Sequence, residues 1–266
     1  MSQDGYDSLF LLFDSPLLQA FREEAYGEDI GQHSWVTAEE LRADIPRLAL
    51  SRSSRLLDLG CGPCGPLTFV VAAVGCEGAG TDRSEPALDR GRARAASLGL
   101  ESRIFLRQAD LDEPLPFESA SFDAVMALDV VIHLKDRVSF FREVARILDR
   151  GRFLLTDAGV RTGPVSEEEA RARSLHGPTQ MVSPGDNEAK LEAAGFRLLE
   201  TEDRTASVVR NASGRLSAIQ AHRREFEELL GKNELKRQVR YLETVRDLSQ
   251  RGAVSRFMYL AEARSI

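Results

Sequence analysis

The chain has 266 residues, of which 42% are hydrophobic, and a formal net charge of −7 at pH 7. This size and composition predict one large α/β core, alone or with a small cap, that buries a full hydrophobic interior. An acidic chain lacks the basic surface that non-specific phosphate binding requires, so we expect no nucleic-acid partner.

The sequence also lacks the patterns of a membrane or secreted protein. No stretch approaches the ~18 consecutive apolar residues that span a bilayer, so we expect no membrane partner. Residues 1–4 lack the basic start of a secretory signal. We therefore expect a cytoplasmic protein whose three cysteines stay reduced.

The first predicted elements form an N-terminal helical lid over residues 1–50. Apolar residues recur at helical spacing within residues 3–25, and a polar segment follows at residues 26–35. Thr37 lies three positions before Glu40, a capping-box pattern that predicts a helix running to about residue 48.

Predicted strands and helices alternate over residues 51–266. Short apolar runs predict strands at residues 55–59, 78–81, 104–106, 122–128, 153–156, 196–200 and 256–261. Helical patterns between them predict helices at residues 67–74, 84–99, 137–148 and 188–194. The alternation predicts an α/β core with a seven-stranded, mainly parallel sheet, helices on both faces and a helical cap.

Two predicted insertions interrupt this core. Residues 158–187 are polar and rich in Gly and Pro, whereas residues 211–251 are strongly helical. Because both follow late strands of the sheet, we expect them to fold over its ligand-binding edge as a cap or lid. No cluster of basic residues suited to clamping a phosphate is evident in either insertion.

The densest motif is the glycine loop, residues 56–65, at the end of the first core strand. Gly60 and Gly62 let the backbone turn sharply and approach a ligand that a β-carbon would exclude. In open α/β sheets, ligands bind beyond the carboxyl ends of the strands. The loop therefore predicts a ligand site at this edge.

Acidic residues accompany three successive strands at the same edge. Asp58 lies beneath the loop, where a carboxylate can hold a cationic amino group. Asp82 follows the second strand, where it can accept both ribose hydroxyl protons, and Asp110 follows the third, where it can accept an adenine amino proton. Together they predict a ligand with an ammonium group, a ribose and an adenine.

On these residues, the chain resembles the class I S-adenosylmethionine-dependent methyltransferases over residues 53–157. Its core motifs are similar to those of small-molecule enzymes, the phosphoethanolamine and sarcosine N-methyltransferases. The resemblance implies a Rossmann-like fold, S-adenosylmethionine as cofactor with S-adenosylhomocysteine as product, and in-line transfer of the methyl group. The cofactor-binding residues that it implies are Asp58, Gly60, Cys61, Gly62, Asp82, Arg83, Asp110, Leu111 and Leu128.

The same loop is compatible with other functions. Its G-x-G-x-x-G spacing also occurs in NAD-dependent oxidoreductases, although Asp58 would repel their pyrophosphate and no Tyr-x-x-x-Lys pair is present. Cys61 and Cys64 spell a thioredoxin-like motif, in which a helix N-terminus would lower the pKa of the first thiol. A non-catalytic S-adenosylmethionine-binding protein is a further alternative. The cysteines have no histidines nearby, so we expect no metal site.

His133 is the predicted catalytic residue. It lies in residues 128–136, which resemble the part of the N-methyltransferases where a histidine faces the methyl group. A neutral imidazole there can accept a proton near pH 7, with packing or a backbone hydrogen bond as its alternative role. Asp129 is an alternative contact to cofactor or acceptor.

Further residues are expected near the acceptor. Tyr241 either lines the acceptor pocket or lies on an exposed face of its helix. The predicted acceptor contacts are Gln32, Trp35, His176 and Gln180, with His33 close to them. These mixed polar and aromatic residues predict a small organic acceptor, methylated on N, O or C. The pattern carries no information on the oligomeric state.

Overall fold

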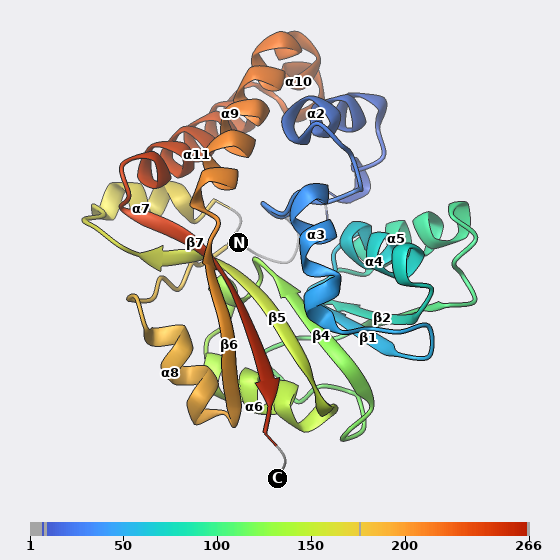
Figure 1. Ribbon diagram of the computed structural model, residues 1–266. Helices are drawn as coiled ribbons and strands as arrows, with labels where there is room; N and C mark the ends of the chain where they lie inside the picture. Colours follow the sequence, from blue (N-terminus) through green and yellow to red (C-terminus); the bar gives the residue numbers. More distant parts are fainter. Residues whose placement is uncertain (1–6, 8–9, 176, 265–266) are drawn as a thin grey trace.

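The computed structural model describes residues 7, 10–175 and 177–264 (Figure 1). Its centre is a seven-stranded sheet with the order β3-β2-β1-β4-β5-β7-β6. Neighbouring strands pair in parallel except where β7 meets β5 and β6, so the mainly parallel sheet expected from the sequence is confirmed. The strands are β1 (Arg55–Leu59), β2 (Glu77–Asp82), β3 (Ile104–Gln108), β4 (Phe122–Leu128), β5 (Leu148–Arg161), β6 (Phe196–Asp203) and β7 (Val254–Ala263).

Helices cover both faces of this sheet. They are α3 (Ala38–Asp44), α4 (Gly65–Val74), α5 (Glu85–Ser97), α6 (Arg137–Ile147) and α8 (Asp186–Ala193). Successive residues of β1 point to opposite faces. Leu56 joins the hydrophobic cluster that includes residues of α3, α4 and α5, and Leu57 joins the cluster that includes residues of α6 and α8. Figure 1 shows these two groups of helices on either side of the strands.

The loops that follow the parallel strands lie at one edge of the sheet. Asp58 of β1 lies in register with Gly80 of β2 and Met126 of β4. Because β1 to β4 run in the same direction, the residues that follow each of them meet beyond their carboxyl ends. This edge therefore brings together the glycine loop and the acidic residues found in the sequence.

A helical layer lies beyond the sheet, and Figure 1 shows α2 next to α9 and α10. Its helices are α2 (Pro16–Tyr26), α7 (Glu167–Arg173), α9 (Thr205–Ala221), α10 (Arg223–Leu230) and α11 (Lys232–Gln250). One hydrophobic cluster contains Leu18 of α2, Phe226 of α10 and Leu242 of α11. The N-terminal helix and the second insertion thus pack on each other.

Some element boundaries differ from the expected ones. The capping box of Thr37 and Glu40 is present, but α3 ends at Asp44 and Pro46–Leu48 form a 3₁₀ helix, η1, because Pro46 has no N–H to continue the α-helical pattern. The strand β5 extends beyond residue 158, and α9 begins before residue 211. The division into a lid at residues 1–50, a core at residues 51–266 and two insertions stays a prediction. Among the described residues, no helix is long and apolar enough to cross a membrane.

Candidate active site

The glycine loop joins β1 to α4 and is held against the end of β2. The amides of Gly60 and Cys61 both donate to the Thr81 carbonyl, at 2.8 and 2.9 Å. Gly60 has φ +73°, and a β-carbon there would lie 2.6 Å from Val130 Cγ2. This turn therefore requires glycine, as the sequence motif predicts.

Asp82 braces the loop from the end of β2. Its Oδ2 accepts from the Gly62 amide and its Oδ1 from the Ser84 amide, each at 2.9 Å. Burial raises the pKa of Asp82, and these two amide donors oppose that rise. The carboxylate lines the cavity next to the loop, so it both shapes the backbone and faces a ligand.

Asp58 is a buried carboxyl group that has no partner among the described residues. Its side chain is 2% exposed and forms no hydrogen bond or ion pair with the residues that the structure describes. Burial, followed by the charge of Asp82, raises the pKa of Asp58 to about 8. A ligand ammonium group at this position would supply the missing positive charge, so the residues fit the methionine end of the expected cofactor.

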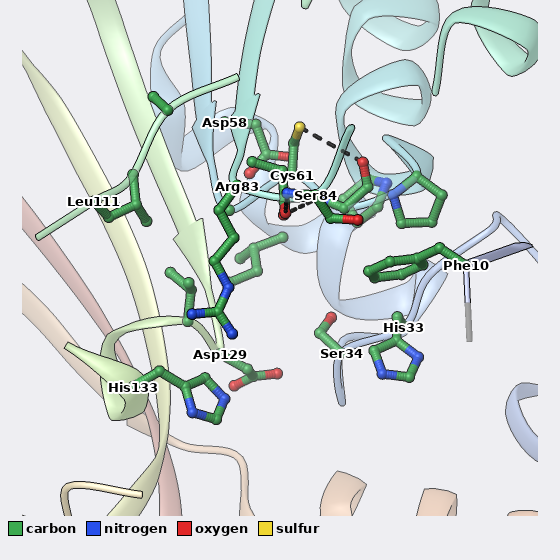
Figure 2. Close-up of a pocket in the computed structure, with 18 of the residues that line it drawn as sticks. Phe10, His33, Ser34, Asp58, Cys61, Arg83, Ser84, Leu111, Asp129 and His133 are labelled. Atoms are coloured by element: carbon green, nitrogen blue, oxygen red, sulfur yellow. Dashed lines mark hydrogen bonds between the residues drawn. The ribbon is translucent and has the colours of Figure 1, made fainter. Parts of the chain in front are cut away.

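One cavity contains every residue predicted to bind the cofactor, and we call it the glycine-loop cavity. Figure 2 shows Asp58 and Cys61 near the loop, with Asp129 and His133 across the cavity from them. Sequence reasoning missed Phe10 and Ser34, which line it too. Neither residue belongs to a recognisable sequence motif, since both lie in the N-terminal segment, outside the glycine loop and the strand ends. The predicted cofactor residues in its wall are Asp58, Gly60, Cys61, Gly62, Asp82, Arg83, Asp110, Leu111 and Leu128. Their contact with the cofactor stays a prediction.

The paired cysteines do not have the environment of a reactive thiol. Cys61 and Cys64 are free and buried, and their sulfur atoms lie 3.5 Å apart. Burial raises the pKa of the Cys61 thiol well above its ordinary value. The thioredoxin-like alternative, which needs a lowered thiol pKa, is therefore not supported, because desolvation of the thiolate outweighs any effect of the helix N-terminus.

His133 lies where the glycine-loop cavity meets a second cavity. It ends the short 3₁₀ helix η2 (Val131–His133), and its Nδ1 is 3.0 Å from the Pro178 carbonyl oxygen. A carbonyl only accepts, so Nδ1 carries the proton and Nε2 of the neutral ring has the basic lone pair. Burial lowers the pKa of His133, the Pro178 hydrogen bond opposes this, and the charge of Arg83 adds to the lowering. The imidazole is therefore neutral at pH 7.

The second cavity, which we call the arginine cavity, lies between the sheet edge and the helical layer. Two arginines in its wall, Arg173 and Arg215, come from the two insertions. Neither insertion alone shows a basic cluster in its sequence, and the fold places one arginine of each in the same cavity wall. The cavity is lined by His33, Ser34, Trp35, Asp129, Ile132, His133, Ala158, Arg173, Thr179, Arg215 and Tyr241.

Asp129 lies between the two cavities and lines both of them. It has φ +58°, and its Oδ1 accepts from Thr156 Oγ1 and from Arg256 Nε, each at 2.8 Å. Its Oδ2 accepts from the Trp35 amide at 2.9 Å. Asp129 therefore holds the N-terminal segment against the sheet, although it also lines both cavities.

The structure separates the predicted acceptor contacts. Trp35 and Tyr241 line the arginine cavity with ring centroids 6.4 Å apart. Gln32 is buried, but its side-chain amide bonds the Ile30 amide and the Glu28 carbonyl within its own loop. Gln180 is exposed, and its backbone bonds Ile132 and Arg137. His176 lies outside the described residues, and the acceptor roles of all four predicted contacts stay predictions.

Among residues 7, 10–175 and 177–264, no group of three or more His, Cys, Asp or Glu side chains has an arrangement that holds a metal ion.

The comparisons with known proteins identify the family. A family model described as a methyltransferase domain matches residues 57–156. The 27-O-demethylrifamycin SV methyltransferase of Amycolatopsis mediterranei is 32% identical over 212 residues, which cover 75% of this chain and 74% of that protein. The chain belongs to the S-adenosylmethionine-dependent methyltransferases.

Two further similarities agree with this family. The methyltransferase is 30% identical over 219 residues to the O-methyltransferase rstn1 of Aspergillus nomiae, across 79% of this chain and 92% of that protein. The structure of phosphoethanolamine N-methyltransferase 2 from Haemonchus contortus, solved with phosphomonomethylethanolamine and S-adenosylhomocysteine, has a TM-score of 0.79 at 21% identity. That match covers 97% of this chain and 59% of the other, and it shows a shared Rossmann-like fold. The resemblance inferred from the motif residues, and the cofactor that it implies, are confirmed.

Proposed function

We propose that this methyltransferase transfers the methyl group of S-adenosylmethionine to an oxygen of a small organic acceptor, with His133 as general base. The observation that carries the proposal is the place of His133 at the junction of the glycine-loop and arginine cavities. A cofactor in the first cavity and an acceptor in the second would meet at its imidazole. The sequence is also compatible with acceptors that are methylated on nitrogen or carbon, and the experiment below distinguishes these from an oxygen acceptor.

The glycine-loop cavity would hold the cofactor in one orientation. Asp58 pairs with its amino group, Asp82 accepts from the ribose hydroxyls, and Asp110 with Leu111 contacts the adenine. S-adenosylmethionine supplies an activated methyl group, so the protein has mainly to align the acceptor and exclude water. The buried carboxyl group of Asp58 supports this orientation, since it has no protein partner among the described residues and an ammonium group would stabilise its ionised form.

His133 would remove the acceptor proton as the new bond to the methyl group forms. A hydroxyl acceptor must lose its proton, and Nε2 of a neutral imidazole is a suitable base for it. The lowered pKa keeps the ring neutral, and the Pro178 carbonyl holds its orientation. An oxygen acceptor is also supported by the relative from Aspergillus nomiae described above, whose name designates an O-methyltransferase.

The helical layer would act as the lid of this site. The proposal is supported by the hydrophobic cluster that α2 shares with α9, α10 and α11, because this cluster lies against Trp35 and Ala158 of the arginine cavity. A closed layer excludes water from the methyl-transfer site.

We further propose a cytoplasmic enzyme without a nucleic-acid partner, supported by the three free cysteines and the net charge of −7.

Transfer of labelled methyl groups tests the proposal. The protein is incubated with methyl-labelled S-adenosylmethionine and with matched sets of alcohols or phenols, amines and carbon nucleophiles, and the product linkage is read by mass spectrometry. We expect label on oxygen. With S-adenosylmethionine saturating, kcat/KM for the acceptor should show an acidic limb with an apparent pKa below the ordinary histidine value of 6.5, since the base must be neutral. Label on nitrogen or carbon alone, or transfer to no class, would contradict it.

A further inference from the structure

The arginine cavity contains two buried guanidinium groups. Arg173 of α7 is 5% exposed and Arg215 of α9 is 8% exposed, and both line the cavity together with Tyr241 of α11. Arginine is rarely buried to this extent unless it is paired. We therefore expect a negatively charged group to balance the two guanidinium groups in this cavity.

Neither guanidinium is fully satisfied by the protein. Arg173 donates through Nη2 to the Ala158 carbonyl. Arg215 donates through Nη2 to the Tyr26 hydroxyl and to the carbonyls of His33 and Ser34. The Nε atoms of both arginines are buried without a hydrogen-bond partner among the described residues. The Nη1 atoms of Arg173 and Arg215 also form no hydrogen bond with any residue that the structure describes.

The neighbouring carboxylates are engaged elsewhere. Asp157 bonds Arg137 at 2.5 Å and also accepts from an asparagine amide, and Asp129 bonds Arg256 at 2.8 Å. Within the described residues, no ion pair includes Arg173 or Arg215. Burial lowers the pKa of Arg215 to about 10 and also lowers that of Arg173, so both lie where a positive charge is poorly solvated.

An apolar chamber continues from this point. The cavity that we call the phenylalanine cavity shares His33, Arg215 and Tyr241 with the arginine cavity. Its apolar lining comes from the helical layer and from the segment before α2: Phe13, Leu18, Phe21, Ile219, Phe226, Leu230 and Leu242. A ligand that spans both cavities would meet two cations at one end and a hydrophobic wall at the other.

We propose that the arginine cavity is a carboxylate subsite, and that the acceptor is a small organic acid whose apolar body lies in the phenylalanine cavity. A carboxylate matches the planar donor array of a guanidinium and would provide the charge that both arginines lack. The acceptor's reacting oxygen then lies toward His133, which is in the wall of the same cavity. This inference deepens the proposed function and rests on it for the identity of the ligand as an acceptor.

Matched probes test the charge preference. Wild-type protein saturated with S-adenosylhomocysteine is titrated calorimetrically with 2-naphthoate and with 2-naphthamide, which share an apolar body and differ in charge. We expect the acid to bind at least about tenfold more tightly, the smaller effect of a charge-assisted hydrogen bond. Arg173→Met and Arg215→Met should each reduce this ratio strongly, and Arg173→Lys should restore part of it.

Two arginines of the same helices supply controls. Arg171 of α7 is exposed and pairs with Glu167, and Arg210 of α9 is exposed. Arg171→Met and Arg210→Met should keep the wild-type ratio of affinities. Arg173 is absent from the lining of the glycine-loop cavity, so Arg173→Met should bind S-adenosylhomocysteine as the wild type does, which also shows that the variant is folded.

The outcomes separate this inference from the proposed function. Equal binding of acid and amide, no binding of the acid by wild type, or a preference that survives both Arg→Met variants would overturn the carboxylate subsite. The same probe pair is titrated into protein without S-adenosylhomocysteine. A preference for the acid there, in a protein that transfers no methyl group to any acceptor class, would keep the subsite and contradict the proposed function.

Discussion

The glycine-loop and arginine cavities meet at His133 but have walls of different construction. Most of the first wall is formed by residues at or just after the ends of β1, β2, β3 and β4, together with residues of the N-terminal segment such as Phe10, and it presents carboxyl groups and backbone amides. The second takes its wall from the N-terminal segment, from residues 158–179 and from α9 and α11, and it presents arginines and aromatic rings. The charge of each wall is opposite to that of the ligand group proposed for it. Substitutions in the two walls should therefore have separable effects on cofactor and acceptor.

The largest separable effect is expected at the junction itself. His133→Ala removes the proposed base, so kcat should fall by about a thousandfold, within the range for general-base catalysis. Affinity for S-adenosylhomocysteine, measured by calorimetry, should stay near the wild-type value. His222→Ala is the matched control, because His222 lies in the helical layer and pairs with Glu24. A His133→Ala enzyme with wild-type kcat would show that the residue only packs or bonds Pro178.

The two walls also differ in how far the sequence predicts them. Asp58, Gly60 and Asp82 lie at ends of successive strands, and strand alternation alone places such residues at one edge. Arg173 and Arg215 come from separate insertions, and no local pattern distinguishes buried Arg173 from exposed Arg171 two positions away. The fold and the cofactor side were therefore predictable from local motifs, whereas the acceptor side depends on long-range packing.

Gln32 illustrates the same limit. Its residue type and position predict an acceptor contact, and this stays a prediction: Gln32 lines the phenylalanine cavity, while its side-chain amide forms local bonds to Ile30 and Glu28. A side-chain amide bonds whichever backbone groups the loop conformation brings within reach. That conformation depends on packing against the helical layer, which the sequence pattern does not specify.

The next effect concerns the cofactor wall alone. Asp82→Ala removes the acceptor of the Gly62 and Ser84 amides together with the proposed ribose contact. Loss of the two proposed hydrogen bonds from the ribose hydroxyls to this carboxylate predicts about hundredfold weaker binding of S-adenosylhomocysteine or more. Calorimetry checks this value. Asp89→Ala, on the exposed face of α5, serves as control, and equal affinities of the two variants would contradict the assignment.

A pH dependence should distinguish Asp58 from the arginine wall. Its pKa of about 8 means that it is largely protonated at pH 7, and only the ionised form pairs with an ammonium group. Affinity for S-adenosylhomocysteine should therefore rise about tenfold per pH unit below about pH 8, then level off until the ligand amine itself loses its proton. Asp58→Asn should abolish this dependence, and a flat wild-type profile would refute the pairing.

The smallest expected effect concerns the cysteine pair. A Cys61–Cys64 disulfide would shift the loop that Thr81 holds, so the oxidised protein should bind S-adenosylhomocysteine several-fold more weakly. Diamide treatment followed by calorimetry measures this change, with Cys64→Ala as a control that cannot form the pair. Unchanged affinity in protein shown by mass spectrometry to contain the disulfide would prove the idea wrong.

The central claim is that the glycine-loop cavity binds the methyl donor, and calorimetric titration of wild-type protein with S-adenosylhomocysteine, with NADH in parallel, tests it most directly. We expect saturable binding of S-adenosylhomocysteine with one site per chain and no heat of binding from NADH. Binding of NADH alone would contradict it, because the cavity would then hold a nicotinamide cofactor in place of the methyl donor.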